Sequence, residues 1–470
     1  MIDKASSGTN FPGRTWLRFF KPPPPAPIVV TDPAEIRVQF KQYQRGILLS
    51  TIIGYACFYL VRKNIGFALP GLHKEFGLTK SAFGMFLTLH GLTYGVSKFA
   101  NGFLADRCNA RVFMVFALVC CCAANVLFGV NSVVVVLGLL WIANGWFQGM
   151  GFPPCARLLT HWFSPKELAT KMSVWNTSHS IGAAVAAVMC GYLAVWSWRL
   201  CFFVPAVLAM GGAIYMWFML RDTPESVGLP EPPGSEQGDL GASQSTAEFK
   251  AFVKKQVFQN PYIWLFGFAN FFVYIIRYAI LDWGPVLLGE AKGIKLTHAG
   301  WMIAFFEVSG VLGMLLGGWI TDKVFAGRCA RTCLFCMLLA GLSIFAFWKI
   351  PGRHSLLSTA ALGCGGFFIY APQALVGIAS ANLATKRAAA TAVGVTGLFG
   401  YLSTIFSGWG LGKLVEVAGW RAGFLSLLAA AVLGALLFAA AWNAKASGYS
   451  EQEPSEDAGK EALARARSKT

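Results

Sequence analysis

The stretch VFMVFALVCCCAANVLFGV, residues 112–130, has no charged side chain. A helix of this length rises about 1.5 Å per residue and can therefore cross the roughly 30 Å hydrocarbon layer of a bilayer. Similar stretches recur along the whole chain of 470 residues, which is 56% hydrophobic and only 13% charged. Soluble domains carry about 25% charged residues. The sequence therefore predicts an all-α membrane protein.

Hydropathy and the polar breaks between apolar stretches predict twelve transmembrane helices in two groups of six. The first group lies near 46–70, 81–105, 112–130, 133–157, 171–196 and 199–220. The second group lies near 260–286, 298–321, 331–349, 356–379, 390–414 and 421–443. The predicted parts are an N-terminal tail (1–45), a first half (46–220), a polar linker (221–258), a second half (259–443) and a C-terminal tail (444–470).

Lysine and arginine are unevenly placed around these spans. Most of the 39 basic residues lie in the two tails, the linker and the loops on their side of the membrane. The positive-inside rule therefore places both termini and the linker in the cytoplasm of a multi-pass inner-membrane protein. The same bias accounts for the net charge of +17, so no nucleic-acid partner is expected. Residues 1–45 contain no apolar segment typical of a signal peptide.

Three features of the first half recur in the second half at similar offsets along the chain, which indicates an internal repeat. They are Gly102-x3-Asp106-Arg107 and Gly318-x3-Asp322-Lys323, Arg62 and Arg277, and Trp198-Arg199 and Trp420-Arg421. We expect two pseudo-symmetric halves around a central site. In the repeated loops, Asp106, Arg107 and Asp322 are expected to form a gating clasp, in which a carboxylate caps a helix N-terminus or pairs with arginine.

Arg62 and Arg277 lie deep inside predicted spans, at equivalent positions of the repeat. An ionised arginine at a helix centre costs at least about 2.5–3.5 kcal/mol. Arg62 precedes His73 by eleven residues, which places it roughly 16 Å below the outer end, too deep for easy escape to the interface. A guanidinium keeps its charge and offers a planar fork of donors, which suits a dianionic phosphate. We expect a bound phosphate to cancel the repulsion between the two arginines, and this predicts obligatory exchange of one phosphate for another.

Other polar residues within the spans are candidates for lining the site or for compensating its charge. Tyr55, Tyr59 and Arg62 share one helix face at i, i+4 and i+7, although each tyrosine alone could be a packing residue. His179 is either a ligand or a hydrogen-bonded core residue. Lys63, Asp282 and Glu307 are interpreted as structural or gating ion pairs, because buried charges need partners. Lys98 and Lys413 are weaker candidates, since lysine can reach the interface.

The chemistry of an enzyme is not apparent in the sequence. The twelve cysteines and six histidines show no metal-ligand spacing, and the cysteines are interpreted as small packing residues. There is no pattern of a nucleophile with its base, and no phosphate-binding glycine loop followed by Lys-Ser/Thr. We therefore expect neither catalysis nor a cofactor nor a metal.

Five motifs together resemble a known family. The loop beginning at Gly102 is similar to the signature loop of the major facilitator superfamily. FYLVRKN (58–64), NGWFQGMG (144–151), SVWNTSH (173–179) and RYAILDW (277–283) resemble its organophosphate:phosphate antiporter family, over about residues 40–440. That family contains glycerol-3-phosphate and hexose-6-phosphate transporters and a closely similar hexose-phosphate sensor. The resemblance implies the major facilitator fold, a monomer, and exchange of an organic phosphate for inorganic phosphate.

The resemblance also implies roles for single residues. Those that match the family's positions are the phosphate-gripping Arg62 and Arg277, the substrate-bonding His179, the cavity-lining Tyr55, Tyr59 and Lys98, and the ion-pair residues Lys63, Asp282 and Glu307. Phe152 departs from the tryptophan of glycerol-phosphate transporters. GWGLGK (408–413) is nearer the hexose-phosphate branch, where charges in the eleventh span affect selectivity, so Lys413 is a candidate specificity residue and glucose-6-phosphate the expected cargo.

Two other functions stay open. A receptor that binds the same ligand and signals to a partner kinase would need the same two arginines. A proton symporter of organic anions would use Asp282, Glu307 or His179 as a titrating group and would not need phosphate inside.

Overall fold

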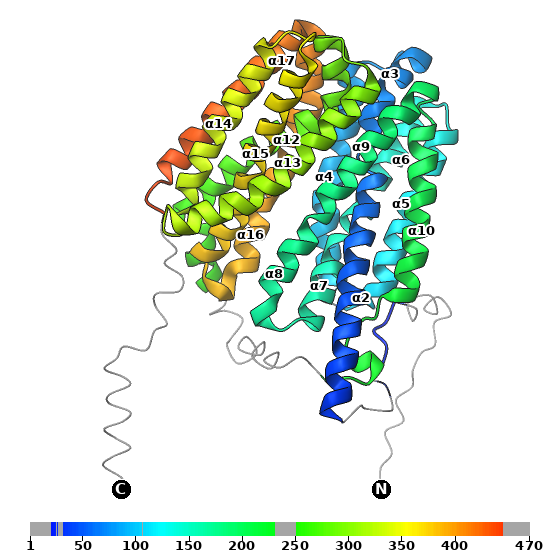
Figure 1. Cartoon of the computed structure of the whole chain (residues 1–470), viewed down its shortest axis with the longest axis vertical. Helices are drawn as coiled ribbons and strands as arrows, with labels where there is room; N and C mark the ends of the chain where they lie inside the picture. Colours follow the sequence, from blue (N-terminus) through cyan, green and yellow to red (C-terminus); the bar gives the residue numbers. More distant parts are fainter. Residues whose placement is uncertain (1–19, 25, 27–31, 106, 231–250, 445–470) are drawn as a thin grey trace. The chain divides into compact units, whose positions relative to one another are not determined.

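The structure, a computed structural model, describes residues 20–24, 26, 32–105, 107–230 and 251–444. These residues form helices joined by short turns, with no strand among them (Figure 1). The chain divides into two compact units, one of residues 1–77 and 89–238, the other of residues 78–88 and 239–470. The predicted all-α fold is confirmed. A helical fold is expected in a bilayer, because every backbone N–H and C=O group there needs a hydrogen-bond partner within the protein.

The first unit holds the helices of the first half and most of helix α4. Their bounds are α2 (Pro33–Leu60), α3 (Ile65–Phe76), α4 (Lys80–Ala105), α5 (Ala110–Val130), α6 (Val134–Gly149), α7 (Phe152–Trp162), α8 (Pro165–Asn176), α9 (Ser178–Trp196), α10 (Leu200–Met219) and the short 3-10 helix η2 (Glu225–Val227).

The second unit holds the helices that follow the linker. Their bounds are the π-helical turn η4 (Lys254–Phe258), α12 (Pro261–Lys292), α13 (Leu296–Lys323), α14 (Cys329–Lys349), α15 (Ser355–Leu383), α16 (Thr385–Leu402), the π-helical turn η5 (Ile405–Gly410) and α17 (Leu411–Ala440). Residues 254–258, predicted as linker, are therefore helical.

The number of spans agrees with the twelve predicted. In the described part of the chain, ten helical stretches are long and apolar enough to cross a membrane. Helix α4 (26 residues) adds an eleventh span, which is less apolar than those ten stretches. The stretch Thr391–Ala440 supplies two crossings, because the backbone turns at Gly419, where φ is 71°. Glycine adopts this left-handed conformation without a steric penalty.

Several spans differ from uniform rods. Helix α2 begins at Pro33, inside the predicted tail, where Asp32 caps it by accepting a 3.1 Å hydrogen bond from the Ala34 N–H. The first span is interrupted between Leu60 and Ile65, and the fourth ends one helix at Gly149 and starts another at Phe152. The second break follows from Pro153 and Pro154, which fit the first turn of a helix but not its interior.

The internal repeat is visible in matching contacts within each unit. The Trp198 indole N–H donates to the Glu75 carboxylate at 2.7 Å, and the Trp420 indole N–H donates to the Glu290 carboxylate at 2.8 Å. In both units a tryptophan that opens the last span thus bonds a carboxylate that ends the first span. The repeat inferred from the sequence therefore extends to individual side chains.

The start of helix α4, residues 78–88, belongs to the second unit. There the Ser81 N–H donates to the Glu416 carboxylate at 2.8 Å, and the Thr88 hydroxyl donates to the Thr404 carbonyl at 2.8 Å. Lys80 pairs with Glu290 at 3.1 Å. Helix α4 therefore contributes to both units, which hydropathy alone cannot reveal.

The turn between α4 and α5 is held by an ion pair that the sequence analysis missed. The Arg157 guanidinium lies 3.2 Å from the Asp222 carboxylate and donates to the carbonyls of Ala105 and Cys108. Asp222 also accepts a 2.8 Å bond from the Ala110 N–H, so it satisfies a donor at the first turn of α5. Asp222 thus does what was expected of Asp106, which lies outside the described residues.

The other two residues of the expected clasp lie at the surface. Arg107, in the turn after α4, is exposed, and so is Asp322 near the end of α13. Their proposed part in gating stays a prediction.

We expect Asp222→Asn to destabilise the protein by about 3–5 kcal/mol, because it leaves the Arg157 guanidinium with an uncompensated charge in a buried site. The measurement is the thermal unfolding midpoint of the purified protein in detergent. Asp322→Asn, the same change at an exposed position, should alter stability by no more than about 0.5 kcal/mol. Equal midpoints for the two variants would show that the ion pair contributes nothing.

Candidate functional site

Arg62 lies in the break of the first span. Helix α2 ends at Leu60 and helix α3 starts at Ile65, so Arg62 and Lys63 occupy a short non-helical turn. Both are buried, with 7% and 8% of their surface exposed. The Arg62 N–H donates to the Tyr59 carbonyl at 3.3 Å, one residue short of the helical partner. The break thus places a guanidinium inside the first unit.

Aromatic rings surround this guanidinium. Its carbon lies 4.1 Å from the centroid of the Tyr94 ring and 5.4 Å from that of Tyr59. The Tyr59 ring in turn lies 5.6 Å from Tyr55 and 5.6 Å from His179. A cation over an aromatic face is stabilised by the ring quadrupole. The structure therefore brings together four residues that the sequence singled out on α2, α9 and the turn after α2.

A glycine explains why His179 lies beside Tyr59. A Cβ atom added at Gly182 would lie 2.4 Å from the Ala56 carbonyl oxygen and 2.9 Å from the Tyr59 side chain. Only glycine therefore allows α9 to approach α2 this closely. The Nδ1 atom of His179 lies 3.1 Å from the Ser180 hydroxyl, which contributes to fixing the imidazole.

Lys98 joins the same group of side chains. Its ammonium lies 3.8 Å from the centroid of the Phe152 ring, and that ring lies 5.4 Å from Trp175 and 6.4 Å from Tyr55. Lys98 also interacts electrostatically with Arg62. We refer to these side chains as the first cluster, which consists of Tyr55, Tyr59, Arg62, Tyr94, Lys98, Phe152, Trp175 and His179.

Arg277 has a comparable setting in the second unit. It is 3% exposed and lies on the continuous helix α12. Its guanidinium carbon lies 4.7 Å from the centroid of the Tyr370 ring and 6.0 Å from those of Tyr274 and Tyr278. The Tyr370 side chain interacts with both Arg277 and Glu307, and Glu307 is fully buried. The second cluster consists of Tyr274, Arg277, Tyr278, Glu307 and Tyr370.

Three predicted residues lie outside the two clusters. Lys63 is an electrostatic neighbour of His90, whose ring stacks on Trp141 at 5.0 Å. Asp282 is half-buried on α12, one turn beyond Tyr278. Lys413 is exposed on the first turn of α17, next to Glu416. The ion pairs expected for Lys63 and Asp282 and the specificity role of Lys413 stay predictions.

Four tyrosines of the clusters, Tyr94, Tyr274, Tyr278 and Tyr370, were not singled out as site residues from the sequence. Tyr94 precedes Lys98 by four residues, so the two share a face of α4, and this spacing could have identified it. Tyr370 gave no such signal, because it contacts Arg277 and Glu307 only through the packing of α15 against α12 and α13. A hydroxyl in an apolar span is too common to single out by itself.

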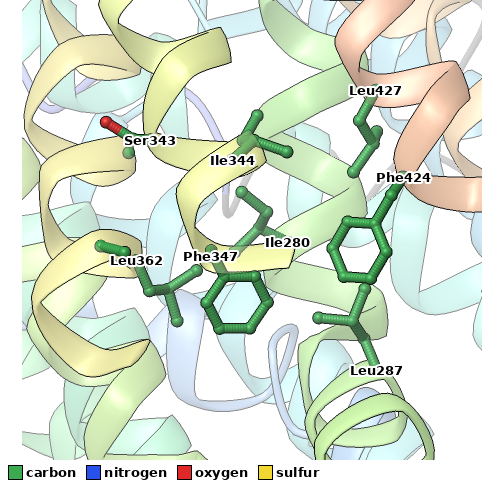
Figure 2. Close-up of a pocket in the computed structure, with 10 residues that line it drawn as sticks. Ile280, Leu287, Ser343, Ile344, Phe347, Leu362, Phe424 and Leu427 are labelled. Carbon is green, nitrogen blue, oxygen red and sulfur yellow. The ribbon is translucent and has the colours of Figure 1, made fainter. Parts of the chain in front are cut away.

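An apolar pocket in the second unit is a different kind of feature (Figure 2). It opens among α12, α14, α15 and α17, and aliphatic and aromatic side chains point into it, while the Ser343 hydroxyl donates to the Leu339 carbonyl of its own helix. None of the ten lining residues is charged. An oxyanion would lose its hydration there without gaining a cation, so the two arginine clusters are the better candidates for a polar ligand.

Comparison with known proteins identifies the family. The model of the Major Facilitator Superfamily matches residues 51–408. A probable hexose phosphate transport protein of Chlamydia pneumoniae is 37% identical over 91% of this chain and 97% of its own length. The glycerol-3-phosphate transporter of Bacillus subtilis is 36% identical over 91% and 98%, and the membrane sensor protein UhpC of Salmonella typhimurium is 38% identical over 92% and 98%.

Solved structures agree at the level of the fold. A bacterial homologue of the human lysosomal transporter Spinster, in an inward-facing and unoccupied conformation, has a TM-score of 0.70 over 86% of this chain and 97% of its own, at 17% identity. Together with the close relatives, this confirms the resemblance noted in the sequence. The chain is a multi-pass membrane protein of the major facilitator superfamily and belongs to its organophosphate:phosphate antiporter family.

Proposed function

We propose that the chain exchanges an organic phosphate, most simply a hexose phosphate such as glucose-6-phosphate, for inorganic phosphate by alternating access. The observation that carries the proposal is one buried arginine in each unit, each lying over a tyrosine ring. Buried guanidinium groups are costly in a membrane unless they serve a ligand or a partner. The names of the relatives, which include hexose phosphate and glycerol-3-phosphate transporters, point to phosphate as that ligand.

In this proposal Arg62 and Arg277 bind the same phosphate group. Two guanidinium groups can together offer bidentate hydrogen bonds to a dianion and neutralise it. Without an anion, the two cations would repel each other, so the empty protein would switch between its inward-open and outward-open states slowly. Exchange would then be obligatory, since each crossing needs a bound phosphate.

The other predicted residues have supporting roles in the proposal. Tyr55, Tyr59 and His179 would contact the organic part of the cargo, and Lys98 would add positive charge at its approach. Lys63, Asp282 and Glu307 would compensate charge when the site is empty, while Asp106, Arg107 and Asp322 would act at the gate. The cargo leaves chemically unchanged, the protein works as a monomer, and both termini lie in the cytoplasm.

A ligand sensor is the second candidate. The relative named as a membrane sensor is 38% identical, and the two named as transporters are 37% and 36% identical, so identity does not separate the two functions. A sensor would bind a hexose phosphate through the same arginines and would act on a partner kinase.

Exchange in proteoliposomes distinguishes these functions. Purified protein in vesicles loaded with phosphate should take up labelled glucose-6-phosphate, and vesicles without internal phosphate should not. Uptake driven by a proton gradient without internal phosphate would indicate a symporter. Binding without uptake would indicate the sensor, and the absence of binding would refute the organophosphate proposal.

Arg62→Lys and Arg277→Lys should each lower exchange by at least about 100-fold, because lysine retains the charge but lacks the planar fork of donors. Initial rates of phosphate–glucose-6-phosphate exchange provide the measurement. Arg353→Lys is the matched control, since Arg353 lies in an exposed turn and donates to His354. An Arg62→Lys or Arg277→Lys variant with the rate of this control would contradict the assignment.

Phe152→Trp should change the choice of cargo more than the rate. The Phe152 ring lies between Lys98 and Trp175, so a larger indole would reduce the space in the first cluster and favour a smaller organic phosphate. We expect the ratio of glycerol-3-phosphate to glucose-6-phosphate uptake to rise about three- to ten-fold. Phosphate–phosphate exchange is the internal control and should persist, while an unchanged ratio would exclude Phe152 from specificity.

A further inference from the structure

The break that carries Arg62 frees two carbonyl groups of the backbone. In an uninterrupted helix the Arg62 N–H would bond to the Phe58 carbonyl, and the Ile65 N–H would bond to the Val61 carbonyl. Here the Arg62 N–H bonds to Tyr59 instead, and Val61 lies in the turn between the helices. A buried carbonyl without a partner is strongly unfavourable, above all where water is excluded.

Side-chain amides from neighbouring helices donate hydrogen bonds to both carbonyls. Gln148 on α6 donates to the Phe58 carbonyl at 2.8 Å. Asn144, one turn earlier on α6, donates to the Val61 carbonyl at 3.1 Å, and Asn125 on α5 donates to the same oxygen at 3.0 Å. The three donors are at most 2% exposed. We refer to Asn125, Asn144 and Gln148 as the amide cradle.

Asn64, at the end of the break, extends this network. Its amide donates to the Asn125 side chain at 2.8 Å and to the Cys201 carbonyl on α10 at 2.8 Å. The turn that carries Arg62 is therefore tied to α5, α6 and α10 by bonds at both of its ends. Four buried amide side chains around one turn of backbone are many for a membrane interior, where polar side chains are costly.

The second unit has no equivalent need. Arg277 lies inside helix α12, which runs without a break from Pro261 to Lys292, and the proline within it, Pro285, comes eight residues after Arg277. The amide cradle is therefore specific to Arg62 and is not a general property of the repeat.

We propose that the amide cradle positions Arg62 for phosphate binding. By occupying the Phe58 and Val61 carbonyls it keeps the span interrupted and fixes the direction in which the guanidinium leaves the backbone. If the break closed into a regular helix, each residue gained or lost would rotate Arg62 by about 100° away from Tyr94. The cradle residues act through Arg62 and do not touch the cargo, so the inference rests on the proposed function.

The two carbonyls differ in how many cradle residues they bond. Phe58 has one amide donor, Gln148, while Val61 has two. Removal of Gln148 should therefore have a larger effect than removal of Asn144, which leaves Asn125 on the Val61 carbonyl. A general loss of helix packing would give no such order.

The test is equilibrium binding of inorganic phosphate to the purified full chain. Gln148→Met keeps a similar volume but has no donor, and we expect phosphate affinity at least about tenfold weaker, with a smaller loss for Asn144→Leu. The matched control is Gln44→Met, since the Gln44 side chain, on α2, also donates to a backbone carbonyl at 2.8 Å, that of Trp162. The control should stay within about twofold of the wild type.

A double-mutant cycle separates positioning from a merely structural role. In an Arg62→Lys background, measured up to high millimolar phosphate, adding Gln148→Met should weaken binding by less than about threefold, because a residue that acts through Arg62 has little left to change. A full additional tenfold loss would overturn the inference, as would Gln148→Met with the affinity of the Gln44→Met control. If Gln148→Met does not fold, as judged by thermal unfolding, Asn144→Leu takes its place in the cycle.

The same experiment keeps the two proposals apart. Wild-type affinity in Arg62→Lys would refute the role of Arg62 in the proposed function, and the cradle's role with it. Loss of affinity in Arg62→Lys with wild-type affinity in both cradle variants would refute the cradle alone.

Discussion

A guanidinium group cannot lose its charge within a membrane, and its burial must therefore be compensated by the surrounding protein. This constraint applies to both units of the chain. Each unit surrounds one arginine with tyrosine rings, whose faces attract a cation and whose hydroxyls can contact a polar ligand. Both arginines therefore keep their charge in a buried, aromatic setting, which suits a dianionic ligand.

The two units solve the problem of placing the arginine differently. In the second, a regular helix carries Arg277, and Glu307 lies close enough to share the contact with Tyr370. In the first, the helix is interrupted at Arg62, and three side-chain amides replace the lost backbone bonds. Interrupted helices recur at the binding sites of transporters, because irregular backbone is tolerated there when its polar groups are satisfied.

Much of this could be predicted from the sequence, and the reason is energetic. Apolar stretches of membrane-spanning length determine the spans, and charges within them are so costly that Arg62 and Arg277 were apparent at once. The break after Leu60 was not apparent, since neither proline nor glycine lies at it and the amides that bond its carbonyls lie on other helices. Asp222 was missed for a similar reason, because it contacts Arg157 and the start of α5 from a distant part of the chain. Both features depend on contacts between helices, and the periodicity of residues along a single helix does not predict such contacts.

The central proposal is that binding of one phosphate requires both Arg62 and Arg277. The number of inorganic phosphate ions bound per chain, measured with radiolabelled phosphate on the purified protein, tests this most directly. The account predicts one phosphate per chain, displaced by glucose-6-phosphate, and a nearly equal loss of binding in Arg62→Lys, in Arg277→Lys and in the double variant. Two phosphates per chain, with each substitution removing only one of them, would contradict it.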